Sequence, residues 1–198
     1  MNSEVTLTNY STHPSSKGQV RLLFKRNDPY HAVLYDEDDA PRYWLSTSNG
    51  LSKVKIRDGA QRTVVEVNRR MLLSDTFTLA DRNEGKAVRV ADVLKQAPTT
   101  SDSQLSMVLH TEQGTYYWRK RRAHHWVLHD GSMHAPVAWT ETVPGTPPTW
   151  ELVVESEASC VLDYILASLF YLKASPDCTE AGSAWDNVNS HSASLVTL

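Results

Sequence analysis

Hydrophobic and polar residues alternate along most of the chain in short runs, and turn-forming residues separate these runs. Apolar residues recur at every second position within Thr63–Val67 and again within Leu105–Leu109. This period is typical of β-strands that bury one face and expose the other. Hairpin-like turns stand between several runs, at Asn49-Gly50, Asp58-Gly59, Gln113-Gly114 and Asp130-Gly131. The pattern therefore predicts an antiparallel β protein.

About twelve strands are expected between residues 19 and 154, at the spacing of an all-β barrel or sandwich. The predicted strands are Gln19–Lys25, His31–Asp36, Arg42–Thr47, Lys53–Arg57, Thr63–Arg69, Leu72–Leu79, Ala87–Val93, Leu105–Thr111, Thr115–Arg121, His125–His129, Pro136–Glu141 and Trp150–Glu155. The segments 96–103 and 144–148 combine Pro with Ser, Thr or Gly, which predicts the two longer loops. Residues 1–18 are rich in Ser, Thr and Asn and predict a flexible N-terminal arm.

One long apolar run, Val161–Leu172, interrupts this strand-like pattern and contains neither Gly nor Pro. Its apolar residues fall on every side of a helix, and such a helix must be surrounded by protein or lipid. At about 1.5 Å per residue the run spans about 18 Å, too short for a hydrocarbon core of about 30 Å. We therefore expect a buried helix over residues 156–174, followed by a polar, poorly ordered tail over residues 175–198.

An open sheet of about twelve strands would leave two exposed edges and would curl. Closure removes the edges, and a barrel of that size has room for a filling element. The sequence thus predicts a mainly β domain over residues 19–174, an antiparallel closed barrel of about twelve strands filled by the hydrophobic helix.

Composition and charge narrow the functional classes. The formal net charge of −3, with a pI of about 6.2 and a mean hydropathy of −0.42, fits a soluble protein and gives no support for nucleic-acid binding. No signal peptide or membrane-spanning run is recognisable, and the two cysteines, Cys160 and Cys178, form no disulfide framework. We expect a cytoplasmic protein with no transmembrane span, peripheral at membranes if it binds lipid.

Three segments carry a family resemblance: Gly114–Arg119 (GTYYWR), Pro136–Trp139 (PVAW) and Leu162–Lys173 (LDYILASLFYLK). With the meandering strands before them, they make the chain similar to the tubby C-terminal fold, which phospholipid scramblases and LURP-one-related proteins share. Within that group it most resembles the uncharacterised fungal tubby-like small-protein family. The resemblance implies the filled barrel and, by analogy with tubby, phosphoinositide binding. The chain lacks the cysteine-rich stretch expected of a scramblase, which argues against scrambling.

The densest positive feature is a basic run bordered by aromatic residues. Four cations within four residues could hold a phosphorylated headgroup, with tryptophan at the membrane interface. The predicted ligand-binding residues are Trp118, Arg119, Lys120, Arg121, Arg122, His124 and Trp126. The competing interpretation is a solvated turn that keeps the sheet soluble, which is the more common role of charge runs.

Metal and catalytic chemistry find little support. His125 and His129 share one face of a strand but lie about 13 Å apart by the strand rise, so we expect no metal site and no cofactor. No nucleophile stands at a motif spacing from a base, and Cys160 leads into an apolar core, so catalytic residues are not predicted. Asp163 is expected to be structural, satisfied either by an arginine from a strand or by a position near the mouth of the barrel.

The expected function is a non-enzymatic binding or adaptor module that engages anionic phospholipid headgroups of the phosphoinositide type. Two alternatives stay open: a protein–protein interaction domain that binds no lipid, and a carrier of a small apolar ligand inside the barrel. An enzyme whose site assembles from distant residues is the least favoured possibility.

Overall fold

The computed structural model describes residues 18–25, 31–48, 52–70, 73–97, 106–122, 125–132, 134–145 and 149–174. The predicted flexible arm, apart from Gly18, and the predicted polar tail lie outside the described residues. Within the described part, thirteen strands form one antiparallel sheet, where about twelve strands were expected.

The strands follow the chain in the order of their numbers. They are β1 (Val20–Phe24), β2 (His31–Tyr35), β3 (Pro41–Ser48), β4 (Lys53–Asp58), β5 (Thr63–Asn68), β6 (Thr76–Leu79), β7 (Val88–Arg89), β8 (Leu94–Gln96), β9 (Ser106–Thr111), β10 (Gly114–Arg122), β11 (His125–His129), β12 (Pro136–Val143) and β13 (Thr149–Val154). The helical elements are η1 (Asn83–Gly85), α1 (Val90–Val93), η2 (Ser156–Val161) and α2 (Leu162–Lys173).

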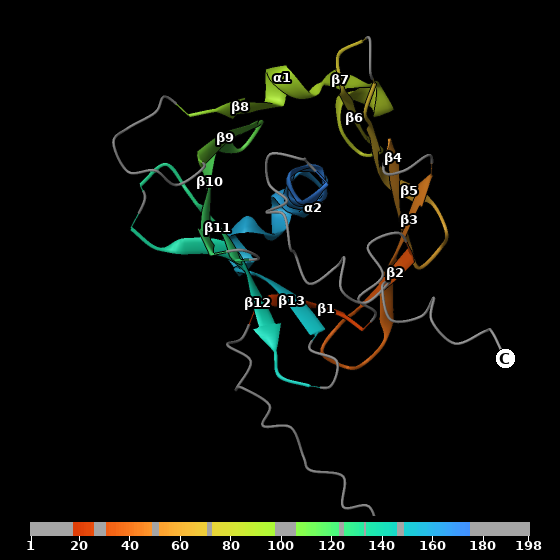
Figure 1. The fold of residues 1–198 in the computed structure, drawn as a ribbon, viewed down its shortest axis with the longest axis vertical. Coiled ribbons are helices and arrows are strands. Elements are labelled where there is room, and N and C mark those ends of the chain that lie inside the picture. Colours follow the sequence, from red (N-terminus) through yellow and green to blue (C-terminus); the bar gives the residue numbers. More distant parts are fainter. Residues whose placement is uncertain are drawn as a thin grey trace, which may run out of the picture.

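The sheet wraps around α2, and among the described residues no hydrogen bonds close it, so the predicted closed barrel is not confirmed. Its order is β7-β6-β5-β4-β3-β2-β1-β13-β12-β11-β10-β9-β8, so β7 and β8 are the two edges. The one-turn helix α1 joins these edges, and Figure 1 shows it between them. Helix α1 takes up four residues of the predicted strand Ala87–Val93, and the edge strands on either side of it have two and three residues. The buried Val90 and Val93 of α1 cover the seam.

Helix α2 lies inside the curved sheet, as the all-round apolar pattern predicts, and Figure 1 views it nearly end-on. Its residues Ile165, Leu166, Ala167 and Leu169 are each at most 1% exposed. The predicted helix over 156–174 begins as the 3-10 turn η2 and becomes α-helical from Leu162. The helix therefore completes a single hydrophobic core with the inward-facing residues of the strands.

Two arginines from the segments that follow β5 and β6 fix both ends of α2. At its start, Arg82 Nε donates to Asp163 Oδ2 at 2.9 Å, which confirms that this carboxylate has an arginine partner. Arg82 lies between β6 and η1 rather than on a strand. At the other end, the guanidinium of Arg69 donates to the backbone carbonyls of Tyr171 and Ala174 and stacks on the Tyr171 ring. The Arg69 side chain thus supplies hydrogen bonds to backbone carbonyls at the C-terminal end of α2, where a helix leaves its carbonyls unpaired.

No helix within the described ranges is both long and apolar enough to cross a membrane. The longest of them, α2, has twelve residues and is enclosed by the sheet.

Candidate functional site

The alternation of side chains along β10 divides the predicted basic run between two faces of the sheet. Trp118 points inward and is 0% exposed, with its indole Nε1 donating to Ser168 Oγ of α2 at 2.9 Å. Trp126 of β11 is 2% exposed and meets Trp118 edge-on, with ring centroids 6.4 Å apart. Both tryptophans belong to the core. The expectation that they border a surface ligand is corrected accordingly.

Arg119 lies on the opposite, outward face of β10 and is exposed. Arg121 is exposed too, and stands where the pairing of β10 with β11 shifts between Lys120 and Arg122. The charges of both arginines act on His129, which places them in one region. Neither makes an ion pair with any residue in the described part of the chain. Lys120 falls on the same face as Trp118, opposite the buried Trp126, and is half-buried. The structure therefore brings two of the predicted cations together on one outer surface.

The remaining predicted residues lie partly outside what the structure describes. Arg122 ends β10 and its backbone pairs with His125, but its side chain is not described. His124 lies outside the described residues.

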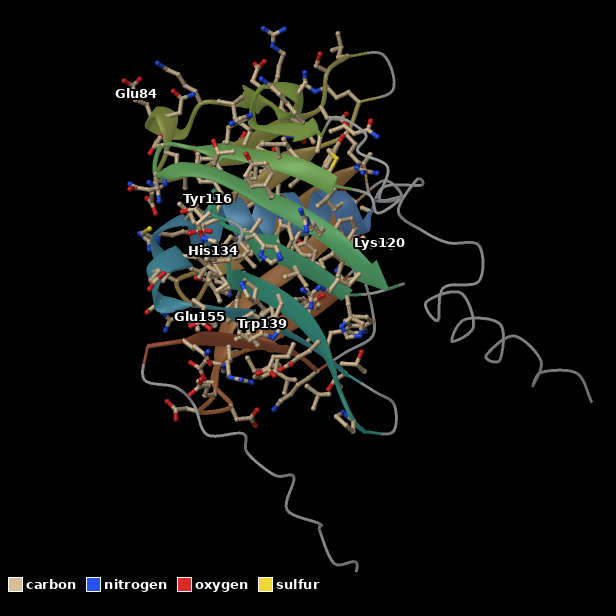
Figure 2. The ribbon with its side chains drawn as sticks, turned by 90° about the vertical axis from the view of Figure 1, so that its left-hand side faces the viewer. Glu84, Tyr116, Lys120, His134, Trp139 and Glu155 are labelled. Carbon is tan, nitrogen blue, oxygen red and sulfur yellow. The ribbon has the colours of Figure 1, made fainter. Side chains whose placement is uncertain are left out.

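A row of outward-facing residues continues from Arg119 across the neighbouring strands. Strand pairing places Val127 beside Arg119, then Trp139, Val153 and finally Arg21 of β1. Val127 and Val153 are only 6% and 0% exposed although they face outward, so longer neighbouring side chains cover them. Trp139 is partly exposed, and Figure 2 shows it on β12 in the outer surface that faces the viewer.

Trp139 was not among the predicted site residues, although it belongs to one of the segments that carry the family resemblance. The alternation within β12 indicates only that Trp139 and Ala138 face opposite ways. Which of them faces outward depends on the pairing with β11 and β13, which is not a local property of the sequence. We define the outer patch as Arg119, Arg121 and Trp139.

An acidic cluster borders the outer patch on the side of β13 and β1. Arg21 Nη1 lies 3.0 Å from Glu151 Oε2 and 3.5 Å from Glu141 Oε1, and Arg21 Nε lies 4.0 Å from Glu37 Oε1. One guanidinium therefore faces three carboxylates. The row that begins with Arg119 ends in a region of negative charge.

Burial raises the pKa of Glu151 above its ordinary value, and the neighbouring Glu141 raises it further, while Arg21 lowers it. Glu141 and Glu151 stand directly opposite each other on β12 and β13. Two like charges in such a cross-strand pair destabilise a sheet.

Replacing Glu141 with glutamine is expected to raise the free energy of unfolding near pH 7 by about 0.2–1 kcal/mol, because it removes this repulsion. A carboxyl group whose pKa is higher in the folded than in the unfolded protein stabilises the fold at low pH. This contribution is lost as the pH rises through the pKa of the folded state. The gain should therefore shrink toward about pH 4, where Glu151 is protonated. Urea denaturation at both pH values measures it. A gain of equal size at both, or a loss near neutrality, would contradict the expectation.

His129 adds a third basic group near the outer patch. It is 6% exposed, and its Nδ1 has no hydrogen-bond partner among the described residues. Burial lowers the pKa of His129, and the charges of Arg119 and Arg121 lower it further. The positive charges of these two arginines therefore disfavour the protonated form of the His129 imidazole.

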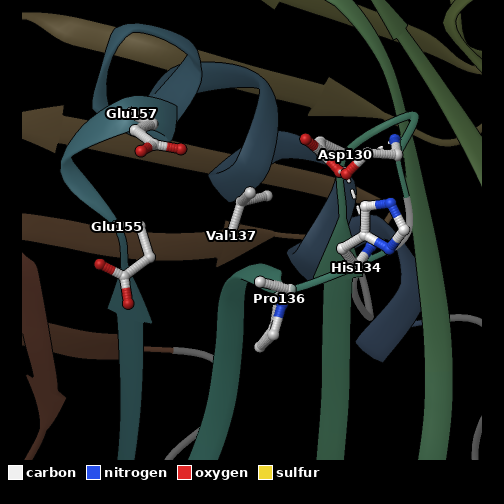
Figure 3. A pocket seen from close by; sticks show the side chains of 8 residues that line it. Asp130, His134, Pro136, Val137, Glu155 and Glu157 are labelled. Atoms are coloured by element: carbon white, nitrogen blue, oxygen red, sulfur yellow. Dashed lines mark hydrogen bonds between the residues drawn. The ribbon is translucent and has the colours of Figure 1, made fainter.

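A hollow of about 350 Å³ opens elsewhere on the surface, between η2 and the turn that follows β11. Figure 3 shows Glu155 and Glu157 on one side of it, with Asp130 and His134 on the other. Asp130 Oδ1 accepts hydrogen bonds from both the backbone N–H and the hydroxyl of Ser132. With three carboxylates in its lining, the hollow is unsuited to an anion. Among the described residues, no three His, Cys, Asp or Glu side chains are grouped so as to hold a metal ion.

Taken together, these features define a β-sheet protein built around its own helix, with a cation–aromatic patch on its outer face. The chain belongs to DUF6593, a family of unknown function, whose model matches residues 27–175. A crystal structure of an Arabidopsis thaliana protein is similar at 13% sequence identity and a TM-score of 0.42, over 78% of this chain and 91% of that one. No curated protein matches the sequence.

Proposed function

We propose that the protein is a non-enzymatic binding module whose outer patch binds phosphate groups of anionic phospholipid headgroups, as phosphoinositides present them. One observation carries this proposal: Arg119 and Arg121 are both exposed near the end of β10, the charges of both act on His129, and no described carboxylate forms an ion pair with either of them. The tubby-like relationship inferred from the sequence is part of the same proposal, as is a cytoplasmic protein that attaches to membranes peripherally.

The chemistry of the patch suits phosphate. Arg119 and Arg121 are two residues apart in β10 and both charges act on His129, so two guanidinium groups can converge on one phosphorylated ring. Arginine donates in a planar fork that matches phosphate oxygens, and this geometry makes charge-assisted pairs strong. The indole of Trp139 adds an amphipathic group of the kind that favours the membrane interface.

Co-sedimentation with phosphatidylcholine vesicles, with and without phosphatidylinositol phosphates, tests the proposal. Wild-type protein should bind the anionic vesicles, less strongly as salt rises. The double variant Arg119→Ala, Arg121→Ala should bind about 30-fold more weakly, since each cation near an anionic surface contributes about 1 kcal/mol. Competition by soluble inositol phosphates separates headgroup recognition from attraction to any charged surface.

The matched control is Arg42→Ala with Arg57→Ala, which removes two cations from β3 and β4, on the other side of α2 from β10 (Figure 1). It leaves the net charge equal to that of the test variant and should leave vesicle binding unchanged. Equal binding by the two double variants, or no binding by the wild type, would refute the proposal.

A protein partner is the second candidate, and the acidic cluster around Arg21 favours it. Three carboxylates beside the outer patch repel an anionic membrane but complement a partner that carries both signs of charge. The apolar-ligand carrier has less support, because α2 and the inward-facing side chains pack together in the interior.

A further inference from the structure

At the end of α2, an amine is enclosed by aromatic rings rather than by carboxylates. Lys173 Nζ lies 4.4 Å from the centre of the Trp150 ring and 5.6 Å from the centre of the Phe24 ring. No ion pair or hydrogen bond joins this amine to another of the described side chains. Lys173 as a whole residue is nonetheless partly exposed.

The described neighbouring groups supply few hydrogen-bond acceptors that would stabilise the ammonium form of Lys173. The carbonyls of Tyr171 and Ala174, natural acceptors at a helix end, are already taken by the Arg69 guanidinium. His125 packs against Trp150 with ring centroids 6.1 Å apart. Its Nδ1 is 3.0 Å from the backbone oxygen of Thr140 and not directed to a carboxylate.

The other described lysines on neighbouring strands are placed differently. Lys25 pairs with Asp39, and Lys53 and Lys55 both pair with Glu66, at 2.8 and 3.4 Å. A carboxylate neighbour stabilises an ammonium and so suppresses the nucleophilic free amine. No carboxylate of the described residues forms an ion pair with Lys173.

We propose that Lys173 is a reactive amine that forms reversible imines with small aldehydes, and that it is the preferred site of such modification in this protein. The nitrogen lone pair adds to the carbonyl carbon, and the carbonyl π electrons and a proton give a carbinolamine hydroxyl. Loss of that hydroxyl with the second amine proton releases one water and leaves the C=N bond. No oxidant or further co-reactant is required, and added water reverses the reaction.

Burial supports this assignment, since it lowers the pKa of Lys173 to about 8. The ring faces attract the ammonium, but they also exclude the water that would solvate it. At pH 7 an amine with a pKa of about 8 is about 9% neutral, against about 0.04% for an ordinary lysine. A less basic amine is also a weaker nucleophile, so the gain in rate is smaller than the gain in free amine.

The test is reductive labelling of the full-length protein with a small aldehyde and cyanoborohydride, followed by quantification of each lysine by peptide mass spectrometry. Near pH 7, Lys173 should be labelled at least about tenfold faster than Lys53 and Lys55. Its rate should level off above about pH 8.

Two variants complete the experiment. Lys173→Arg should abolish the fast phase, and Lys53→Arg should preserve it. Because the wild-type profile is informative by itself, the test does not depend on either variant folding. Labelling of Lys173 at the rate of the paired lysines, or a rate that still rises at about pH 10, would overturn the proposal.

Discussion

Replacing Trp118 with alanine is expected to lower the free energy of unfolding by about 3–5 kcal/mol, the cost of truncating a large buried aromatic residue. The indole is fully buried, packs edge-on against Trp126 and donates to Ser168 on α2. Its loss would leave a cavity between the sheet and the helix. Since small domains are stable by about 5–15 kcal/mol, the change removes a large share of the total.

Urea denaturation measures this effect as a shift of the midpoint at constant slope. Trp118→Phe separates the two contributions: it retains most of the packing and loses the hydrogen bond, for a smaller cost. Trp139→Ala is the matched control, because it truncates a partly exposed tryptophan of the same sheet. If Trp118→Ala costs no more than Trp139→Ala, the helix is not held by Trp118 as described.

The second large effect is expected at Arg82, whose guanidinium links the start of α2 to η2 and to the turn between β9 and β10. It donates to Asp163 Oδ2, to Glu112 Oε2 at 3.2 Å and to the backbone oxygen of Cys160. Arg82→Ala removes these charge-assisted bonds and leaves Asp163 without its cation. We expect a loss of about 1.5–3 kcal/mol, limited by the partial exposure of both side chains.

A double-mutant cycle with Asp163→Asn isolates the pair. The coupling energy between Arg82 and Asp163 should be at least about 0.5 kcal/mol, as expected for residues in direct contact. Arg89→Ala supplies the control, since its ion pair with Asp92 is exposed on both sides and contributes little. Additive effects of Arg82→Ala and Asp163→Asn would show that the ion pair does not anchor the helix.

The candidate site was only partly predictable, and Trp118 and Arg119 show why. Both stand in the same basic-aromatic run, and alternation along a strand requires that they face opposite sides. The sequence of that run does not indicate which face is covered. Trp118 faces inward because its indole donates a hydrogen bond to Ser168 of α2 and packs edge-on against Trp126 of β11. Trp139 joined Arg119 and Arg121 through strand pairing alone.

By itself, the sequence determined that this chain forms many short antiparallel strands around one buried helix, because local periods of two residues and all-round apolarity are properties of contiguous segments. It also required a cationic partner for Asp163 or a position near the mouth of the barrel, because a carboxylate in an apolar helix is costly when unpaired. Only the tertiary structure decided that the partner is Arg82, that α1 bridges an unclosed seam, and which cations share the outer face. Those outcomes depend on contacts between residues distant in the chain, and the free energy of such contacts is fixed by the register and curvature of the whole sheet.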